Sequence, residues 1–264
     1  MSEPRLPRLV AFDFDGVLCD TAREAFRSAW AVCRDLKLVD GAPPPDLGAA
    51  FLRMRPVAEF GYEFPVLLLA LKEGAPEPEL ERSFQSVWRP RILERYGLTR
   101  PQLTAGLDTA RDRAIREDLD GWLSEQGLYP GVAERLRAIL ADGLLAYVIT
   151  TKGGRFAQKL LEIHGVAFPA DRVWGKEQGR PKAALLRSLI QTYGLRPAEV
   201  WFVEDRLQTL RAVEREPDLQ EVGLIFATWG YTLSDERLAA AVDPRIVPIT
   251  LAEFARGFEA WRRR

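Results

Sequence analysis

The stretch Leu9-Val10-Ala11-Phe12-Asp13-Phe14-Asp15-Gly16-Val17-Leu18 joins a short apolar run to two aspartates and a glycine. An apolar run of this length is typical of a strand buried on both faces, and the polar residues mark the sheet edge at which it ends. Asp15-Gly16 is also a frequent hairpin turn, but a hairpin needs a returning strand. After Cys19 the chain instead shows apolar residues at three- and four-residue steps from Thr21 to Leu36. We therefore expect a buried strand followed by a helix.

The rest of the chain divides into a helical block and an alternating block. From about Asp20 to Gly127 the sequence shows helical patterns interrupted by proline and glycine, without a convincing strand. Strands and helices then alternate. The expected strands are Leu144–Thr150, Arg172–Trp174, Val200–Val203 and Val222–Ala227, and the expected helices between them include Arg155–Ile163, Lys182–Tyr193 and Leu207–Val213. This alternation predicts an α/β fold with a parallel sheet covered by helices on both faces, and a helical insertion after the first strand.

Composition limits the classes of function. The 264 residues include 37 basic and 38 acidic side chains, so no strong field favours a nucleic-acid or membrane partner. The longest apolar run, Val66–Leu71, is far shorter than the roughly 20 residues that span a bilayer. Two cysteines and no signal-peptide pattern favour a cytoplasmic protein. The sole histidine, His164, fits the end of a helix, so we expect the chemistry to rest on carboxylates, hydroxyls and lysine.

Polar side chains follow several of the expected strands. Asp13 and Asp15 follow the first strand, the second strand ends in Thr150-Thr151-Lys152, and Glu204-Asp205 follows Val200–Val203. Lys182 begins the helix before that last strand. Each feature alone has an ordinary explanation as a turn, a helix cap or a surface residue. Ligands of parallel sheets bind beyond the carboxyl ends of the strands, however, and the coincidence of these residues there predicts a site.

Together these residues resemble the four motifs of the haloacid dehalogenase-like (HAD) superfamily, in the branch of phosphoglycolate phosphatase and β-phosphoglucomutase. Asp13-Phe14-Asp15-Gly16-Val17-Leu18 matches the first motif, Val148-Ile149-Thr150 the second and Val203-Glu204-Asp205 the fourth. The resemblance implies a Rossmann-like catalytic core of residues 1–20 and 128–264, and an inserted all-helical cap domain of residues 21–127. It also implies an enzyme, a phosphoric monoester hydrolase.

The resemblance also implies roles for individual residues. Asp13 would be the nucleophile and Asp15 the general acid and base. Alternate residues of an extended strand share a face, so Asp15 would point into the same crevice as Asp13. Thr150 and Lys182 would hold and neutralise the phosphoryl group. The hard ion Mg²⁺ would be bound by Asp13, the Asp15 carbonyl, Glu204 and Asp205. The expected substrate-binding residues are Gly16, Thr151, Lys152, Arg23 and Arg27.

Two departures from the family pattern affect these assignments. The third motif often reads Lys-Pro-x-Pro, whereas this chain has Gly179-Arg180-Pro181-Lys182. We assign the role to Lys182, because Pro181 at the first helical position puts Lys182 in the first turn of the helix; Lys176 and Arg180 remain alternatives. The fourth motif has Thr209 where many members have a second aspartate, and resembles the subset that uses adjacent Glu and Asp.

The expected function is a Mg²⁺-dependent phosphatase that hydrolyses a small phosphorylated metabolite through an aspartyl-phosphate. Asp15 argues against a dehalogenase, which needs no acid at that position. Phosphonatases use a lysine of the cap as a Schiff base. The early cap helix here has only one lysine, Lys37, near its end, which argues against a phosphonatase. A phosphomutase of the β-phosphoglucomutase type and a non-catalytic binding member remain alternatives. The sequence determines neither the identity of the substrate nor the oligomeric state.

Overall fold

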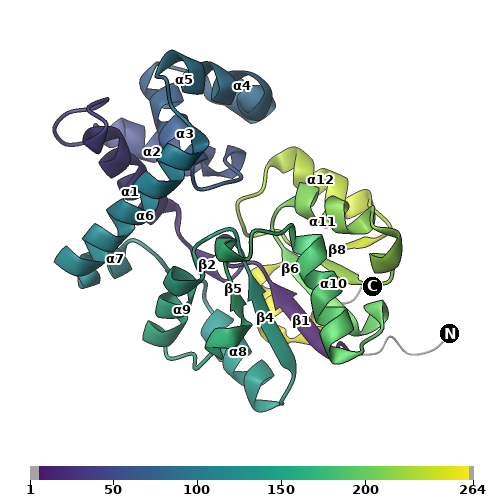
Figure 1. The fold of residues 1–264 in the computed structure, drawn as a ribbon. Helices are drawn as coiled ribbons and strands as arrows, with labels where there is room; N and C mark the ends of the chain where they lie inside the picture. Colours follow the sequence, from purple (N-terminus) through teal and green to yellow (C-terminus); the bar gives the residue numbers. More distant parts are fainter. Residues whose placement is uncertain (1–5, 262–264) are drawn as a thin grey trace. The chain divides into compact units, whose positions relative to one another are not determined.

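The computed structural model describes residues 6–261, which form two compact units. Among the described residues, the first unit contains residues 6–20 and 127–261, and the second contains residues 21–126. In the first unit, six strands form one parallel sheet in the order β5-β4-β1-β6-β7-β8 (Figure 1). The strands are β1 Leu9–Phe12, β4 Leu145–Ile149, β5 Val173–Trp174, β6 Val200–Glu204, β7 Gly223–Ala227 and β8 Ile246–Ile249. The expected α/β fold with a parallel, Rossmann-like sheet is confirmed.

Helices cover both faces of this sheet, because alternate strand residues point to opposite sides. One face packs Leu9, Ala11 and Phe202 against apolar residues of three helices, α10 (Lys182–Tyr193), α11 (Leu207–Glu214) and α12 (Ser234–Val242). On the opposite face, Phe12 makes edge contacts with the rings of Phe254 and Trp261. The helices of the unit are α8 Val132–Ala141, α9 Gly154–Ile163, α10 Lys182–Tyr193, α11 Leu207–Glu214, α12 Ser234–Val242 and α13 Leu251–Arg256.

Strand order locates the edge at which a ligand would bind. The chain passes from β1 to β4 on one side and later to β6 on the other, so β1 lies where the order reverses. In such sheets the crevice beyond the carboxyl ends of the strands at this reversal is the usual binding place. Asp13, Thr150 and Glu204 stand at the ends of β1, β4 and β6.

A second, two-stranded sheet joins the points where the chain leaves and re-enters the first unit. Strand β2, Cys19–Asp20, pairs antiparallel with β3, Gly127–Leu128. The helical unit between them contains α1 Ala22–Asp35, α2 Pro45–Met54, α3 Glu63–Lys72, α4 Glu77–Ser83, α5 Arg89–Arg95, α6 Arg100–Glu117 and α7 Leu119–Ser124. A π-helical turn, Phe84–Trp88, links α4 to α5. None of the described helices in either unit has the length and apolarity that a membrane span requires.

Candidate active site

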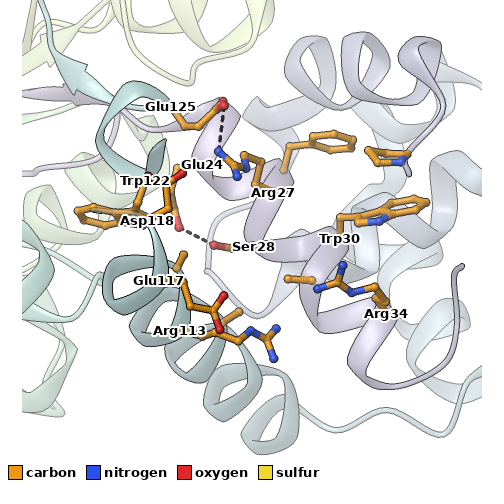
Figure 2. A pocket seen from close by; sticks show the side chains of 15 residues that line it. Glu24, Arg27, Ser28, Trp30, Arg34, Arg113, Glu117, Asp118, Trp122 and Glu125 are labelled. Atoms are coloured by element: carbon orange, nitrogen blue, oxygen red, sulfur yellow. Dashed lines mark hydrogen bonds and ion pairs between the residues drawn. The ribbon is translucent and has the colours of Figure 1, made fainter. Parts of the chain in front are cut away.

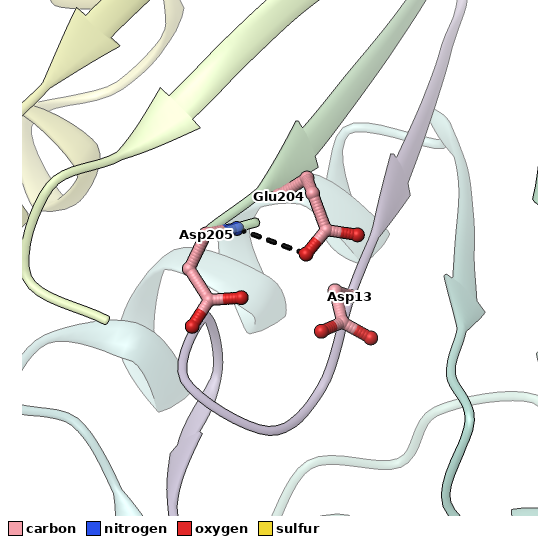
Figure 3. Close-up of side chains that lie close together, drawn as sticks. All are labelled: Asp13, Glu204 and Asp205. Carbon is pink, nitrogen blue, oxygen red and sulfur yellow. Dashed lines mark hydrogen bonds between the residues drawn. The ribbon is translucent and has the colours of Figure 1, made fainter. Parts of the chain in front are cut away.

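Three acidic side chains meet at the carboxyl ends of β1 and β6. Asp13 directly follows β1, Glu204 is the last residue of β6, and Asp205 comes next. One oxygen from each carboxylate lies within 4.8 Å of the other two, and all three residues are buried. Figure 3 shows the three side chains gathered where the two strands end. Adjacent strands of a parallel sheet therefore bring together residues that are nearly two hundred positions apart in the sequence.

Lys182 supplies a positive charge to this acidic cluster. Its Nζ lies 2.7 Å from Asp13 Oδ1 and 2.7 Å from Glu204 Oε2. Lys182 is the first residue of α10; Pro181, expected at the first helical position, is instead the N-cap residue, and Lys182 still lies in the first turn. Arg180 instead donates to Ser188 Oγ at 3.0 Å, and Lys176 lies in the short 3₁₀ helix Lys176–Gln178. Of the three candidates for the third motif, the structure thus gives Lys182 contacts with both carboxylates.

Glu204 and Asp205 differ in how their oxygens are used. Glu204 Oε1 accepts hydrogen bonds from the backbone N–H groups of Asp205 and Arg206, at 3.1 and 3.0 Å, and its Oε2 accepts one from Lys182. Asp205 Oδ2 accepts one from the Tyr231 N–H at 2.6 Å. Asp205 Oδ1 is buried and accepts no hydrogen bond within the described part of the chain. Asp205 therefore retains an oxygen for a ligand.

Burial changes the protonation of the cluster. It raises the pKa of Asp13 to about 7 in spite of Lys182, and Glu204 adds to the rise. Burial likewise raises the pKa of Glu204 to about 7 against the pull of Lys182, and it raises the pKa of Asp205. Burial alone would lower the pKa of Lys182, but the Asp13 and Glu204 carboxylates outweigh it and hold that pKa above its ordinary value. Lys182 thus serves two of the three carboxylates, Asp13 and Glu204, whereas the charge that opposes the rise at Asp205 is that of Arg206.

This donor set fits a hard divalent cation. Carboxylate oxygens are the ligands that Mg²⁺ prefers, and a cation would offset the excess negative charge that burial makes unfavourable. Asp205 Oδ1, which is buried without a hydrogen-bond donor, is the kind of oxygen that such an ion satisfies. The cluster of Asp13, Glu204 and Asp205 can therefore hold a metal ion.

The raised pKa values predict how the stability of the metal-free protein depends on pH. Asp13 and Glu204 keep protons in the folded state up to about pH 7, whereas an unfolded chain releases them near pH 4. The folded state therefore binds more protons between these values, and the free energy of unfolding falls as pH rises through this window. We expect a lower thermal midpoint at pH 8 than at pH 5.5 in chelator. In an Asp13→Asn variant, measured alongside, the thermal midpoint should depend less on pH. An equal dependence on pH in both proteins would show that Asp13 does not contribute to it.

Asp15 and the residues after β4 form the other side of the site. Asp15 Oδ1 lies 3.3 Å from Nζ of Lys152, whose side chain is only 1% exposed. Thr150 is buried, and its Oγ1 accepts a hydrogen bond from the Lys152 N–H at 3.1 Å. Thr151 is exposed. Thr151 and Lys152 were expected to bind substrate, and that role stays a prediction for both. The structure adds that Lys152 contacts the carboxylate of Asp15.

Gly16 is required by the backbone and by its neighbour Asp205. Its φ is +89°, a conformation that side chains rarely adopt. A Cβ at this position would lie 2.0 Å from Asp205 Oδ2, so any larger residue would displace that carboxylate. The expected role of Gly16 in substrate binding stays a prediction; the observed role is to let the turn after β1 approach Asp205.

Sequence reasoning missed the loop after β7, residues 228–232, hereafter the β7 loop. Trp229 Nε1 donates to the Val17 carbonyl at 3.1 Å, and the Tyr231 N–H holds Asp205. A Cβ on Gly230 would lie 2.4 Å from the Gly16 carbonyl oxygen. The sequence did contain a signal for the β7 loop. Val222–Ala227 was expected as a strand, and the residues that follow a parallel strand lie at the edge where ligands bind.

The two arginines expected to bind substrate lie on α1 in the helical unit. Arg23 is exposed, and Arg27 donates to the Gly121 carbonyl at 3.3 Å and to Glu125 Oε1 at 3.1 Å. Arg27 borders a pocket of about 300 Å³ in this unit (Figure 2). Other residues that line the pocket include Trp30, Arg34, Arg113, Glu117 and Trp122. Arg27 thus has partners within its own unit, and binding of substrate by Arg23 and Arg27 stays a prediction.

Comparison with known proteins identifies the family. Residues 7–215 match the family model described as haloacid dehalogenase-like hydrolase. The chain is similar to the phosphoglycolate phosphatase of Pseudomonas putida, with 28% identity over 86% of this chain and 71% of the relative. It is also similar to that of Escherichia coli, with 26% identity over 86% of this chain and 84% of the relative.

A solved structure supports the same fold. The crystal structure of a predicted phosphatase from Clostridium acetobutylicum matches 96% of this chain and 98% of its own length, with a TM-score of 0.56 at 19% identity. The chain belongs to the haloacid dehalogenase-like hydrolase family. The expectation of an enzyme in the phosphoglycolate phosphatase-like branch, with phosphatase activity, is confirmed.

Proposed function

We propose that this enzyme is a Mg²⁺-dependent phosphatase that hydrolyses a small phosphate monoester through an aspartyl-phosphate on Asp13. One observation carries the proposal: Asp13 is buried between Lys182 and two further carboxylates at the edge of the sheet, and a second aspartate, Asp15, follows two residues later. In this proposal, neighbouring strand ends supply the nucleophile, the acid–base residue and the metal ligands, and the first residue of α10 supplies the countercharge.

In the proposed first step, a carboxylate oxygen of Asp13 attacks phosphorus, and the bond to the leaving oxygen breaks as Asp15 donates a proton to that oxygen. In the second step, Asp15 accepts a proton from water, which attacks the phosphorus of the acyl phosphate. Inorganic phosphate leaves and the Asp13 carboxylate is restored. Lys152 Nζ lies 3.3 Å from Asp15 Oδ1 and is proposed to hold this carboxylate in position for both steps.

The remaining residues orient and neutralise the phosphoryl group. We assign Lys182 to balance its negative charge and Thr150 Oγ1 to donate a hydrogen bond to one of its oxygens. The proposed ligands of Mg²⁺ are Asp13, the Asp15 carbonyl, Glu204 and Asp205, with Asp205 best supported because Oδ1 lacks a donor in the described residues. Bound Mg²⁺ would supply positive charge that orients the phosphoryl group and offsets the charge of the attacking carboxylate.

We further propose that residues 21–126 are the cap domain and contribute to the choice of substrate. The relatives named phosphoglycolate phosphatase make 2-phosphoglycolate the first substrate to test. It is a small phosphorylated metabolite, as the sequence predicted. Both cysteines, Cys19 and Cys33, are free and buried, which agrees with the proposed cytoplasmic location.

The test is a turnover assay on a panel of phosphate monoesters that contains 2-phosphoglycolate and several sugar phosphates. We expect release of inorganic phosphate that requires Mg²⁺, stops on addition of a chelator and resumes when excess Mg²⁺ is restored. Interconversion of sugar phosphates with little phosphate release would instead indicate a mutase. Absence of both reactions across the panel would indicate a binding protein and contradict the proposal.

A further inference from the structure

The β7 loop connects the acidic cluster to the strand pair β2–β3. The Tyr231 N–H donates to Asp205 Oδ2 at 2.6 Å, and the Tyr231 hydroxyl donates to Asp20 Oδ1 at 2.8 Å. Asp20 is the last residue of the catalytic unit before the helical insertion, and it pairs with Gly127, where the chain returns. One buried residue, 7% exposed, therefore contacts a carboxylate of the acidic cluster with its backbone and the root of the insertion with its side chain.

The surroundings of Tyr231 leave little freedom for this residue to move independently. Trp229 Nε1 is bonded to the Val17 carbonyl in the turn after β1. Gly230 packs so closely that a Cβ would lie 2.4 Å from Asp205 Cβ and from the Gly16 carbonyl oxygen. Thr228 is anchored to the neighbouring strand by hydrogen bonds from its N–H and Oγ1 to the Ile249 carbonyl. The β7 loop thus has three separate anchors.

We propose that Tyr231 is a positioning residue that couples the geometry of Asp205, and through it metal affinity, to the β2–β3 strand pair. The backbone N–H fixes one oxygen of Asp205, which leaves Oδ1 directed to the ligand. The Asp20 hydrogen bond holds Tyr231 in place, so loss of that bond loosens the support of Asp205. Residues that orient a metal ligand commonly change metal affinity by about ten- to a hundredfold, although they never touch the ion. By linkage, occupation of Asp205 stabilises the Tyr231–Asp20 contact to the same extent.

The inference rests on the proposed Mg²⁺ site, and a double-mutant cycle tests it. Mg²⁺ affinity would be measured by calorimetry for the wild type, Tyr231→Phe, Asp20→Ala and the double variant. Each single change removes one partner of the same hydrogen bond and is expected to weaken Mg²⁺ binding about tenfold. The double variant should bind Mg²⁺ no more weakly than Tyr231→Phe, because that single change already removes the Asp20 bond together with the Tyr129 hydrogen bond. Thr228→Val, which removes a hydrogen bond in the same loop away from the cluster, should bind Mg²⁺ like the wild type.

Hydrogen exchange provides a second measurement of the coupling between Asp205 and the β2–β3 strand pair, and it requires no turnover. Hydrogen exchange at the β2 and β3 amides should slow on addition of Mg²⁺ in the wild type and in Thr228→Val, and change little in Tyr231→Phe. Multiplicative losses of affinity in the double variant, or equal Mg²⁺ protection in Tyr231→Phe, would overturn the inference. Absence of Mg²⁺ binding by the wild type would instead contradict the proposed metal site, so the two failures are distinguishable. If Asp20→Ala does not fold, the comparison of Mg²⁺ affinity and hydrogen exchange between Tyr231→Phe and Thr228→Val still tests the inference.

Discussion

Replacing Asp13 by asparagine should lower kcat by a factor on the order of 10⁴ or more, because an amide cannot form the acyl phosphate. The same change should leave the metal-free protein at least as stable as the wild type at pH 8. Asparagine has the shape of aspartate but removes one charge from a cluster of three buried carboxylates, and Lys182 keeps its contact with Glu204. Steady-state kinetics and thermal unfolding in chelator measure the two effects.

The control for Asp13→Asn is Asp142→Asn, the same chemical change at an exposed helix end in the same unit. It should alter neither kcat nor the dependence of stability on pH. Retention of substantial turnover by Asp13→Asn would exclude this residue as the nucleophile. Loss of turnover together with a large fall in stability would show that the variant misfolds and that the kinetic result reports structure alone.

Replacing Lys182 by methionine is the second change with a large expected effect. It leaves Asp13 and Glu204 buried without their countercharge, and breaking one partner of such a pair costs about 3 kcal/mol of unfolding free energy. The cost should be largest at pH 8 and smaller near pH 5.5, where protonation of Asp13 and Glu204 removes the unpaired charges. Turnover should fall by a factor on the order of 10³, because the phosphoryl charge loses a fixed donor.

Variants at the other candidates for the third motif provide the matched comparison. Lys176→Met and Arg180→Met remove a cation outside the described contacts of the cluster and should change kcat little, whereas Lys182→Arg keeps the charge and should recover part of the stability. Unfolding by denaturant at the two pH values, with kcat for each variant, separates these roles. A loss of turnover in Arg180→Met that equals the loss in Lys182→Met would contradict the assignment of Lys182.

The sequence predicted the parts of the fold that leave a periodic or apolar signature. Alternating apolar runs and helical patterns revealed the parallel sheet, and the helix Lys182–Tyr193 has the expected bounds. The pair β2–β3 was missed because strands of two residues carry no periodicity. Strand β8 was missed as well. Pro248 argues against a strand, but it is tolerated here because β8 lies at the edge of the sheet.

The candidate site was predictable wherever a motif sat directly at a strand end. Asp13, Thr150 and Glu204 were found in this way, and the proline before Lys182 selected that lysine over Arg180. Tyr231 was missed because its effect passes through backbone and hydroxyl hydrogen bonds that no motif marks. The partner of Arg27, Glu125, was also beyond prediction, because 98 residues separate the two and only the packing of the helices brings them together.

The central claim is that Asp13 becomes phosphorylated, and trapping that species tests it most directly. An Asp15→Asn variant should react with an aryl phosphate, whose leaving group needs no proton, but it should hydrolyse the acyl phosphate slowly because the general base is absent. After an acid quench, mass spectrometry should find one phosphoryl group on the peptide that contains Asp13. The double variant Asp13→Asn with Asp15→Asn should carry none. Phosphate on another residue, or consumption of the ester with no phosphorylated peptide, would contradict the account.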